Sequence, residues 1–444
     1  MRYIPNTRRD KDVMLDAIGV DAFEKLVSNI PEGLLLNAQL NIPAALSEPD
    51  IRRELLALSN SNADASGYAS FLGGGANDHF IPSVVEHLAF RSEFYTAYTP
   101  YQAEVSQGVL QATFEYQSMV CELTGMAAAN ASMYDGASAM AEAALMAQRL
   151  TKRSEVAVSM AVHPSYRQVL RTYMRGIGSE IVEIPYLPAE GVTDLEALVE
   201  DITVNTAAVI IQYPNFFGCV EYLQEASRLA HDKGALLIAV IDPISMGILK
   251  SPGELGADIV VGEGQALGKT LSYGGPYLGI FACKEEHLRQ MPGRVVGETK
   301  DKNGRRGYVL TLQTREQHIK RERATSNICT NESLIALIAA VYLAALGRQG
   351  LKEVAGLCLQ KSHYAYDELI KRPGVGGAFS APFFKEFVVR LKKDPLQVNR
   401  KLIKNKIIGG LDLGVYYPEL KNHMLIAVTE KRTKEEIDSF AGLL

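Results

Sequence analysis

The sequence has no tryptophan and little cysteine. Its five cysteines are spread over 444 residues without any C-x-x-C pair: Cys121, Cys219, Cys283, Cys329 and Cys358. An odd, scattered set argues against a disulfide framework and against a zinc site. We therefore expect no bound metal and a location in the reducing cytoplasm.

The sequence also lacks an excess of charge of one sign and a long hydrophobic run. It has 46 basic and 51 acidic residues and no long basic segment, so nucleic acid is not an expected partner. Residues Met1–Asn6 have no apolar core of the length that a signal peptide needs. The longest apolar run, Leu334–Leu346, is too short to span a bilayer, so it predicts a buried helix and no membrane contact.

What remains is an ordinary globular composition, with 47% hydrophobic and 22% charged residues. The length predicts two or three domains. Short amphipathic helices predict an N-terminal arm over residues 1–75, in which Ser47 and Pro49 begin one helix and Ser66–Asn77 form a glycine-rich loop. A large domain is predicted over residues 76–330 and a small α+β domain over residues 331–444.

Helical and strand patterns alternate in the large domain. A helix is predicted over Glu104–Leu123, with Gly125 as its C-terminal cap, and another over Met140–Leu150. Continuous apolar strands separated by helices predict an α/β fold with a mostly parallel sheet covered on both faces. The predicted strands are Glu155–Met160, Glu180–Ile184, Ala207–Gln212, Leu236–Ile241, Asp258–Val261 and Tyr277–Ala282, and the helices between them are Gln168–Tyr173, Asp194–Glu200 and Glu221–Asp232.

The alternation stops near residue 283. A polar, glycine-bearing segment over residues 297–307 leads to a predicted basic helix over Arg315–Arg323. The small α+β domain follows, with strands over Glu386–Leu391 and Leu425–Val428 and a closing helix over Lys434–Leu443.

A turn rich in small residues begins the alanine-rich helix of the large domain. It comprises Asp135, Gly136, Ala137 and Ser138. Free backbone N–H groups at such a helix start suit a phosphate, although many turns of this kind only cap a helix.

Three further residues follow predicted strands, where ligands bind in parallel sheets. His163 is placed either to stack on a flat heteroaromatic ring or to serve as an ordinary loop histidine. Asp242 needs a partner, which a pyridinium nitrogen, a helix N-terminus or an arginine would supply. Asn215 lies just past the strand that ends at Gln212.

Together these features resemble the aspartate-aminotransferase-like family of pyridoxal-phosphate enzymes (fold type I), in which a lysine binds the cofactor covalently. The resemblance places that lysine eight residues past Asp258, where this chain has Ala266, preceded by Gln265. Lys269, three residues later, stays open as an alternative lysine. A carboxylate at Glu263 would repel a phosphate, so the resemblance implies a cofactor cradle that has lost its cofactor.

A longer motif is more specific. Tyr98–Gly108 reads Tyr-Thr-Pro-Tyr-Gln-Ala-Glu-Val-Ser-Gln-Gly and resembles a motif of the decarboxylating glycine dehydrogenase family, the P-proteins of the glycine cleavage system. Ala103 replaces the usual proline and puts no chemistry in doubt. The resemblance covers nearly the whole chain and continues over Ala129–Gly136, Gln212–Gly218, Gly262–Gln265, Leu312–His318 and Thr325–Asn331.

The resemblance implies an α-type subunit. In that family the N-terminal half or α chain has no cofactor lysine, and the C-terminal half or β chain has it. It therefore implies pyridoxal phosphate on a β subunit, none bound covalently to this chain, and an α2β2 assembly. The implied reaction decarboxylates glycine and passes its aminomethyl group to the lipoyl arm of the H-protein.

Candidates for contact with the partners are aromatic or basic. Tyr95, Tyr98, Tyr101 and Gln102 are placed to reach a shared site at the α–β interface, although the tyrosines suit a core equally well. The basic cluster (Lys320, Arg321 and Arg323) receives the H-protein, pairs with local acids or forms a solvated helix face. Two other functions stay open: a self-sufficient pyridoxal-phosphate enzyme that uses Lys269, and a purely architectural subunit.

Overall fold

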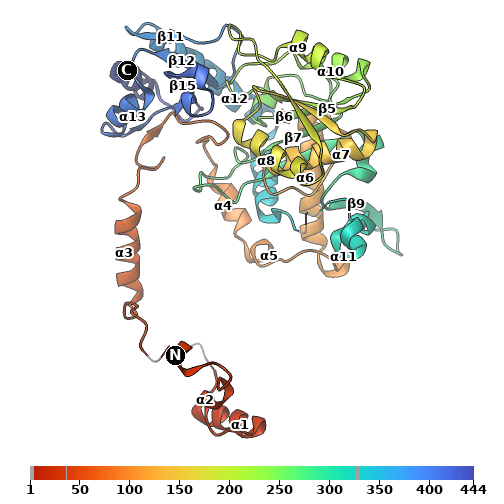
Figure 1. Cartoon of the computed structure of the whole chain (residues 1–444), viewed down its shortest axis with the longest axis vertical. Coiled ribbons are helices and arrows are strands. Elements are labelled where there is room, and N and C mark those ends of the chain that lie inside the picture. The colour runs from red at the N-terminus through yellow and green to blue at the C-terminus, as the bar shows by residue number, and fades with distance from the viewer. Residues whose placement is uncertain (1–4, 37, 327, 329) are drawn as a thin grey trace. The chain divides into compact units, whose positions relative to one another are not determined.

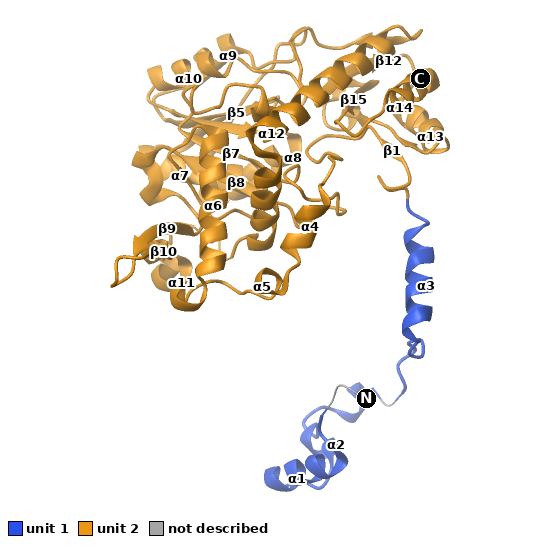
Figure 2. Cartoon of the chain, turned by 180° about the vertical axis from the view of Figure 1, so that it is seen from behind, with its two compact units in different colours: residues 1–62 blue, residues 63–444 orange. Residues whose placement is uncertain are grey.

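The computed structural model describes residues 5–36, 38–326, 328 and 330–444. Contacts divide the chain into two compact units, residues 1–62 and residues 63–444 (Figure 2). The predicted domain borders at residues 75 and 330 stay predictions.

The first unit is a set of short helices, and the described residues of this unit form no buried core. No described side chain of its three α-helices is buried: α1 (Arg8–Ile18), α2 (Phe23–Leu26) and α3 (Glu48–Ser59). The Ser47 side chain accepts a hydrogen bond from Asp50 N, and Pro49 lies in the first turn of α3, as predicted.

The second unit is built on a seven-stranded sheet with the order β2-β8-β7-β6-β5-β3-β4 (Figure 1). Strands β3 to β7 run parallel, and β8 is antiparallel to both of its neighbours. The predicted α/β fold with a mostly parallel sheet is confirmed. The strands are β2 (Ala128–Ala129), β3 (Glu155–Ser159), β4 (Glu180–Ile184), β5 (Thr206–Tyr213), β6 (Leu236–Ile241), β7 (Ile259–Glu263) and β8 (Gly279–Cys283).

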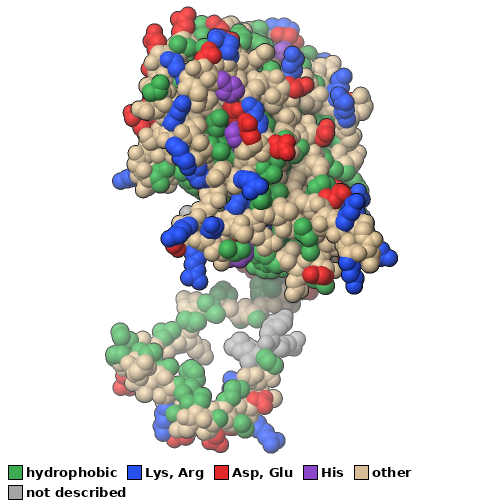
Figure 3. All heavy atoms as spheres, turned by 90° about the vertical axis from the view of Figure 1, so that its right-hand side faces the viewer, with side chains coloured by type: hydrophobic (Ala, Val, Ile, Leu, Met, Phe, Trp, Pro, Cys, Tyr) green, Lys and Arg blue, Asp and Glu red, His purple; other side chains and the backbone are tan. Residues whose placement is uncertain are grey.

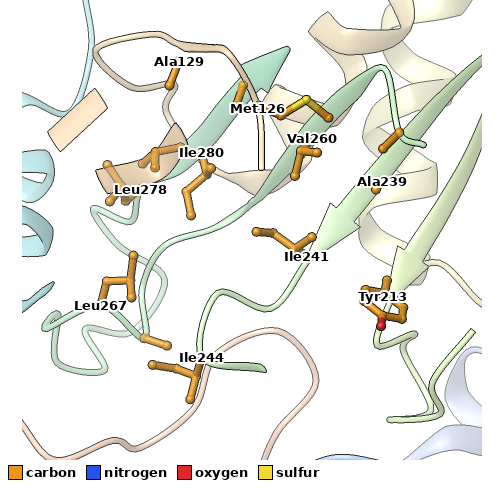
Figure 4. Packing of buried hydrophobic residues seen from close by; sticks show 14 of the residues in the cluster. Met126, Ala129, Tyr213, Ala239, Ile241, Ile244, Val260, Leu267, Leu278 and Ile280 are labelled. Atoms are coloured by element: carbon orange, nitrogen blue, oxygen red, sulfur yellow. The ribbon is translucent and has the colours of Figure 1, made fainter. Parts of the chain in front are cut away.

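Both faces of this sheet are buried. Along β5, Ala208 and Ile210 pack on one face and Val209 and Ile211 on the other, because side chains alternate along a strand. Figure 4 shows part of the second face, with Ala239, Ile241, Val260 and Ile280 in one apolar cluster. Helices α7 (Gly136–Thr151) and α8 (Pro164–Arg175) cover the first face, and α6 (Gln107–Thr124), α9 (Leu195–Asp201) and α10 (Leu223–Asp232) contribute to the second.

The C-terminal part carries a four-stranded antiparallel sheet. Its order is β11-β12-β15-β14, and it includes the two predicted strands as β12 (Glu386–Leu391) and β15 (His423–Ala427). Residues just after the first unit pair with this part, since β1 (Ala69–Ser70) runs parallel to β13 (Ile407–Ile408). The remaining elements are β11 (Val375–Gly377), β14 (Leu411–Asp412), α13 (Pro395–Ile403) and the predicted closing helix α14 (Lys434–Leu443).

Helix α12 (Ser333–Ile370) extends from the part of the unit that holds the large sheet to the part that holds the C-terminal sheet (Figure 2). It is longer than the apolar run that predicted it, because the chain continues past a break at Gly347, where φ is +60°. By length and composition alone this helix would be able to cross a membrane. Its buried residues, such as Ile335 and Ala339, belong to the core cluster of the large sheet, and it packs on α4 (Ser83–Ala89) and α6.

The structure differs from the sequence-based prediction in three segments. The long helix starts at Gln107 rather than Glu104, because residues Ala103–Val105 form a 3₁₀ turn; its C-terminal cap at Gly125, with φ +69°, is confirmed. The polar segment over residues 297–307 belongs to a hairpin of β9 (Val295–Lys300) and β10 (Arg306–Thr311). The predicted basic helix is not continuous: Gln317–Lys320 (α11) is α-helical, short 3₁₀ turns over Gln313–Arg315 and Arg321–Arg323 flank it, and the backbone changes direction at Arg321, where φ is +53°.

Candidate functional site

A cavity of about 50 Å³ lies beyond the carboxyl ends of β3, β5, β6 and β7. Parallel strands that end together bring their following residues to one place, which is why six of the predicted residues meet here. They are His163, Asn215, Asp242, Glu263, Gln265 and Ala266. The opposite wall comes from residues that the sequence did not single out: Gly75, Asn77, Phe384, Lys385 and Glu386.

The small-residue turn at the start of α7 is a capped helix N-terminus. The Asp135 carboxylate accepts a hydrogen bond from Ser138 N at 2.7 Å, and Ser138 Oγ bonds back to the Asp135 backbone. A Cβ atom at Gly136 would lie 2.6 Å from the Tyr166 hydroxyl, so only glycine fits there. Ala137 is half-buried in the same turn.

The helix start is turned toward Glu263, at the end of β7. Gly136 N donates to Glu263 Oε2 at 3.0 Å, while Leu278 N and Gln265 N donate to Oε1 at 2.9 and 3.1 Å. Burial raises the pKa of the Glu263 carboxyl to about 7, although these backbone hydrogen bonds work in the opposite direction. The Glu263 carboxylate therefore takes the place where a helix N-terminus would hold an anion.

Asp242, after β6, has Lys385 as its partner. Lys385 Nζ lies 2.8 Å from Asp242 Oδ2, and the Lys385 side chain is only 2% exposed. Burial disfavours the Lys385 ammonium, but the adjacent carboxylate outweighs this effect and raises the pKa of Lys385. The predicted need for a partner is met by a lysine, which was not among the alternatives considered.

The ion pair continues into a buried chain of hydrogen bonds. Lys385 Nζ donates to His79 Nε2 at 2.9 Å, and His79 Nδ1 donates to Glu430 Oε2 at 2.7 Å. Burial and the Lys385 charge lower the pKa of His79, which keeps the imidazole neutral and in this tautomer. Cys358 Sγ also lies near Glu430 Oε2, and ligand atoms of His79, Cys358 and Glu430 are within 4.8 Å of one another. The Glu430 oxygens already accept bonds from His79 and from Phe80 N, so we assign this group to the network.

His163 is fixed by its surroundings. Ser165 N donates to its Nδ1 at 3.1 Å, so the proton lies on Nε2 and is donated to Gly74 O at 2.8 Å. Burial lowers the pKa of this imidazole. One face stacks on Tyr166, with ring centroids 4.7 Å apart, and Phe216 lies edge-on. The predicted stacking on a cofactor ring stays a prediction.

Asn215 is a turn residue as well as part of the cavity wall. Its amide donates to Gly191 O and to Glu221 Oε1, both at 2.7 Å, and its oxygen accepts from Phe217 N and Cys219 N. This complete set of hydrogen bonds explains why an amide is buried here.

The loop after β7 has no lysine in the cavity. Gln265 is buried, and its side chain pairs with both backbone groups of Asn77. Ala266 lines the cavity with its methyl group. Lys269 is not among the lining residues, and its Nζ donates to Ser272 Oγ at 2.8 Å.

The tyrosine segment lies elsewhere on the same unit. Tyr95 and Tyr98 are 57% and 89% exposed and border a groove of about 260 Å³, whereas Tyr101 is held by Arg294. Arg294 donates to the Tyr101 hydroxyl at 3.0 Å and to Asn331 Oδ1 at 3.2 Å. Gln102 is exposed. Tyr101 is itself 47% exposed, so none of the three tyrosines is buried in a core, and Tyr101 differs from the other two in being held by Arg294.

The basic cluster (Lys320, Arg321 and Arg323) is exposed. On the face of residues 63–444 in Figure 3, basic and acidic side chains are interspersed. Asn327 and Cys329, from the motif Thr325–Asn331, lie outside the described residues.

Lys385, His79 and Glu430 had escaped the sequence reasoning. Lys385 is a charged residue between Phe384 and the apolar strand β12, and an interruption of that kind is the signal that would have marked it. Nothing in the local sequence marks His79 or Glu430.

Comparison with known proteins identifies the family. The sequence profile of the glycine cleavage system P-proteins matches residues 1–444. The chain belongs to the glycine cleavage system P-protein family. A probable glycine dehydrogenase (decarboxylating) subunit 1 of Desulforamulus reducens is 56% identical over 100% of this chain and 99% of its own length. Its counterpart of Geobacillus thermodenitrificans is 54% identical over 100% of this chain and 98% of its own length.

Solved structures agree with this family and with the predicted fold. A glycine decarboxylase (P-protein) of the glycine cleavage system in inhibitor-bound form is 44% identical, with a TM-score of 0.90 over 100% of this chain and 99% of that one. A sphingosine-1-phosphate lyase of Burkholderia pseudomallei has a TM-score of 0.66 over 93% of each chain at 16% identity, a likeness of fold alone. The aspartate-aminotransferase-like fold (fold type I) is confirmed.

The P-protein family implies pyridoxal phosphate in the complex. The residues of the cavity in this chain do not fit it. The lysine position holds Ala266, the helix N-terminus faces Glu263, and Asp242 is paired with Lys385. The cavity is about a third of the volume of the ~150 Å³ cavity that holds a benzene molecule.

Proposed function

We propose that this chain is the α-type subunit of a two-chain glycine decarboxylase of the glycine cleavage system. The observation that carries the proposal is a full-length match to relatives named subunit 1, in a chain whose lysine position is Ala266. A β subunit is proposed to carry pyridoxal phosphate and this chain none, in an α2β2 assembly in the cytoplasm.

The proposed reaction removes carbon dioxide from glycine and passes the aminomethyl group to the lipoyl arm of the H-protein. Pyridoxal phosphate on the β subunit supplies a ring that accepts the electron pair left by carbon dioxide. We derive no catalytic step through the cavity of this chain, because its residues do not fit the cofactor.

The role of this chain is to shape the entrance to the active site of the β subunit. Exposed Tyr98 and Tyr95 are amphipathic aromatics of the kind enriched at interfaces, and Gln102 is exposed beside them. Arg294 supports this segment by donating to Tyr101 and by lying 5.3 Å from the Tyr101 ring centroid. A segment held in this way would exclude water from the partner's site and orient the lipoyl arm. The exposed basic cluster is the proposed contact with the H-protein.

Borohydride trapping with pyridoxal phosphate tests the proposal. The chain is treated alone and mixed with a candidate β chain, and peptide mass mapping locates any pyridoxyl-lysine. We expect the label on the β chain only, with glycine–bicarbonate exchange only in the mixture. A label on Lys269 of this chain alone would instead support a self-sufficient enzyme.

The architectural alternative needs a second measurement. A Tyr98→Ala variant is mixed with the β chain, and assembly and exchange are both measured. A shared site predicts loss of exchange with assembly intact. Unchanged exchange in the Tyr98 variant, together with loss of assembly in other surface variants, would support a purely architectural role.

A further inference from the structure

We propose that side chains of this chain occupy the places of the charged groups of pyridoxal phosphate: Glu263 stands in for the phosphate and Lys385 for the pyridinium nitrogen. The cavity is thereby closed to the cofactor even without a covalent bond. This inference concerns the isolated chain and holds or fails independently of whether a β chain carries the cofactor.

The phosphate end is filled by a carboxylate. A helix of 16 residues, α7, begins at this end, and its first N–H, at Gly136, donates to Glu263 Oε2 at 3.0 Å. The same carboxylate accepts hydrogen bonds from two further backbone N–H groups, at Gln265 and Leu278. Three donors that converge on one anion form the kind of cradle that holds a phosphate. Here the anion is built into the chain, at the end of β7.

The ring end is filled by an ammonium. In pyridoxal-phosphate enzymes an acidic residue commonly faces the pyridinium nitrogen. In this chain the acid after β6, Asp242, has Lys385 Nζ at 2.8 Å. Lys385 is held there from its other side by His79, which in turn bonds to Glu430. A ring nitrogen would reach Asp242 only by displacing this buried lysine.

Charge and space both oppose a cofactor. Glu386, whose carboxylate accepts from Gly74 N at 2.8 Å, lines the cavity together with Glu263 and Asp242. A phosphate dianion would therefore enter among three acidic side chains, and Lys385, the cationic side chain among the described lining residues, is already paired with Asp242. The cavity volume of about 50 Å³ is below the ~150 Å³ that holds a benzene molecule, so a ring and a phosphate would enter fully only if lining side chains moved.

The test measures noncovalent binding directly. Pyridoxamine phosphate has the same ring and phosphate but cannot form an imine with a lysine, so titration of the full chain by calorimetry reports the fit of the cavity alone. Wild type is compared with a Glu263→Gly, Lys385→Ala double variant, which removes both stand-in groups and opens the space that they fill. The matched control is Lys284→Ala, because Lys284 also pairs with a buried aspartate, Asp258, but does not line the cavity.

We expect no saturable binding to wild type or to Lys284→Ala, and saturable one-site binding to the double variant. Saturable one-site binding to wild type would overturn the proposal, as would a pyridoxyl group on Lys385 after borohydride treatment with pyridoxal phosphate. A folded double variant that gains nothing would overturn the assignment of these two side chains. If circular dichroism shows that the double variant is unfolded, the Glu263→Gly single variant is titrated under the same criteria.

Discussion

The Glu263 carboxyl makes the stability of this chain depend on pH in a defined direction. Replacing it by glutamine removes the titration, keeps the side-chain size and leaves one oxygen to accept the hydrogen bonds of Leu278 and Gln265. The new amide nitrogen faces Gly136 N, so one donor–donor contact is created. That contact shifts stability equally at every pH and is separable from the titration.

The sign and the size of this pH effect on stability follow from the linkage between proton binding and folding. Burial raises the pKa of Glu263 from 4.5 to about 7 in the folded chain. Between these two values the folded state binds more protons than the unfolded state, so stability falls as pH rises. At about 1.4 kcal/mol per pKa unit, the full effect is about 3 kcal/mol. We expect wild type to lose about 3 kcal/mol relative to Glu263→Gln between pH 4.5 and pH 8.

The assay is urea unfolding followed by far-ultraviolet circular dichroism, because the chain has no tryptophan to report by fluorescence. The free energy of unfolding of wild type minus that of Glu263→Gln is plotted against pH, so that other titrating groups cancel. Glu298→Gln, at an exposed position of β9, serves as the control and should give a flat difference. A flat difference for Glu263→Gln as well would refute the burial argument, and a difference that rises with pH would reverse its sign.

Three further predictions address the rest of the molecule. Gly218→Ala would place a Cβ 1.8 Å from the Glu386 carbonyl oxygen at a φ of +86°, and we expect a loss of roughly 3 kcal/mol or more in urea unfolding. Arg294→Lys removes the two guanidinium nitrogens that hydrogen-bond to Tyr101 and Asn331. We expect the free energy of unfolding to fall by about 2 kcal/mol, and glycine–bicarbonate exchange in the mixture with the β chain to become slower. Tyr98→Ala removes a side chain that is 89% exposed, so the free energy of unfolding should change by less than about 0.5 kcal/mol. The rate of glycine–bicarbonate exchange in the mixture with the β chain should fall.

Sequence patterns predicted the large sheet because a strand that is buried on both faces has a nearly continuous run of apolar residues. Strand β6 is apolar throughout and β5 is apolar over Ala207–Ile211, and the helix between them, α10, buries an apolar stripe that includes Leu223, Ala226 and Ala230. The meeting of His163, Asp242 and Glu263 followed from the same pattern, since parallel strands end at one edge of the sheet. Local patterns were therefore sufficient for one wall of the cavity.

The other wall could not be predicted, because it comes from distant parts of the chain. His79 contacts Lys385 across 306 residues, and no local pattern links the two positions. A lone charged residue is normally a surface residue, so Lys385 was not expected to be 2% exposed. The partner of Asp242 was correctly required by desolvation, but its identity depends on tertiary contacts.

Two errors have a common cause. The segment Arg315–Arg323 has the charges of a surface helix but no apolar stripe to bury, so tertiary contacts hold only one helical turn. The hairpin of β9 and β10 was missed because its connecting residues are polar, yet Val296, Tyr308 and Leu310 pack against Leu110 of α6. In both segments the sequence-based prediction gave more weight to charge and polarity than to the positions of the few apolar residues.

The pairing of Asp242 with Lys385 has a consequence beyond cofactor exclusion. Asp242 follows β6 of the large sheet, and Lys385 precedes β12 of the C-terminal sheet. The ion pair therefore connects the two sheets. A cofactor site that had lost only its lysine would still be empty and acidic at this point, and its carboxylates would be buried without a counter-charge. Filling it with an internal cation removes that cost and keeps the two sheets together without ligand. The contribution that we propose for this chain in the complex comes instead from its surface, where the exposed tyrosines Tyr95 and Tyr98 lie.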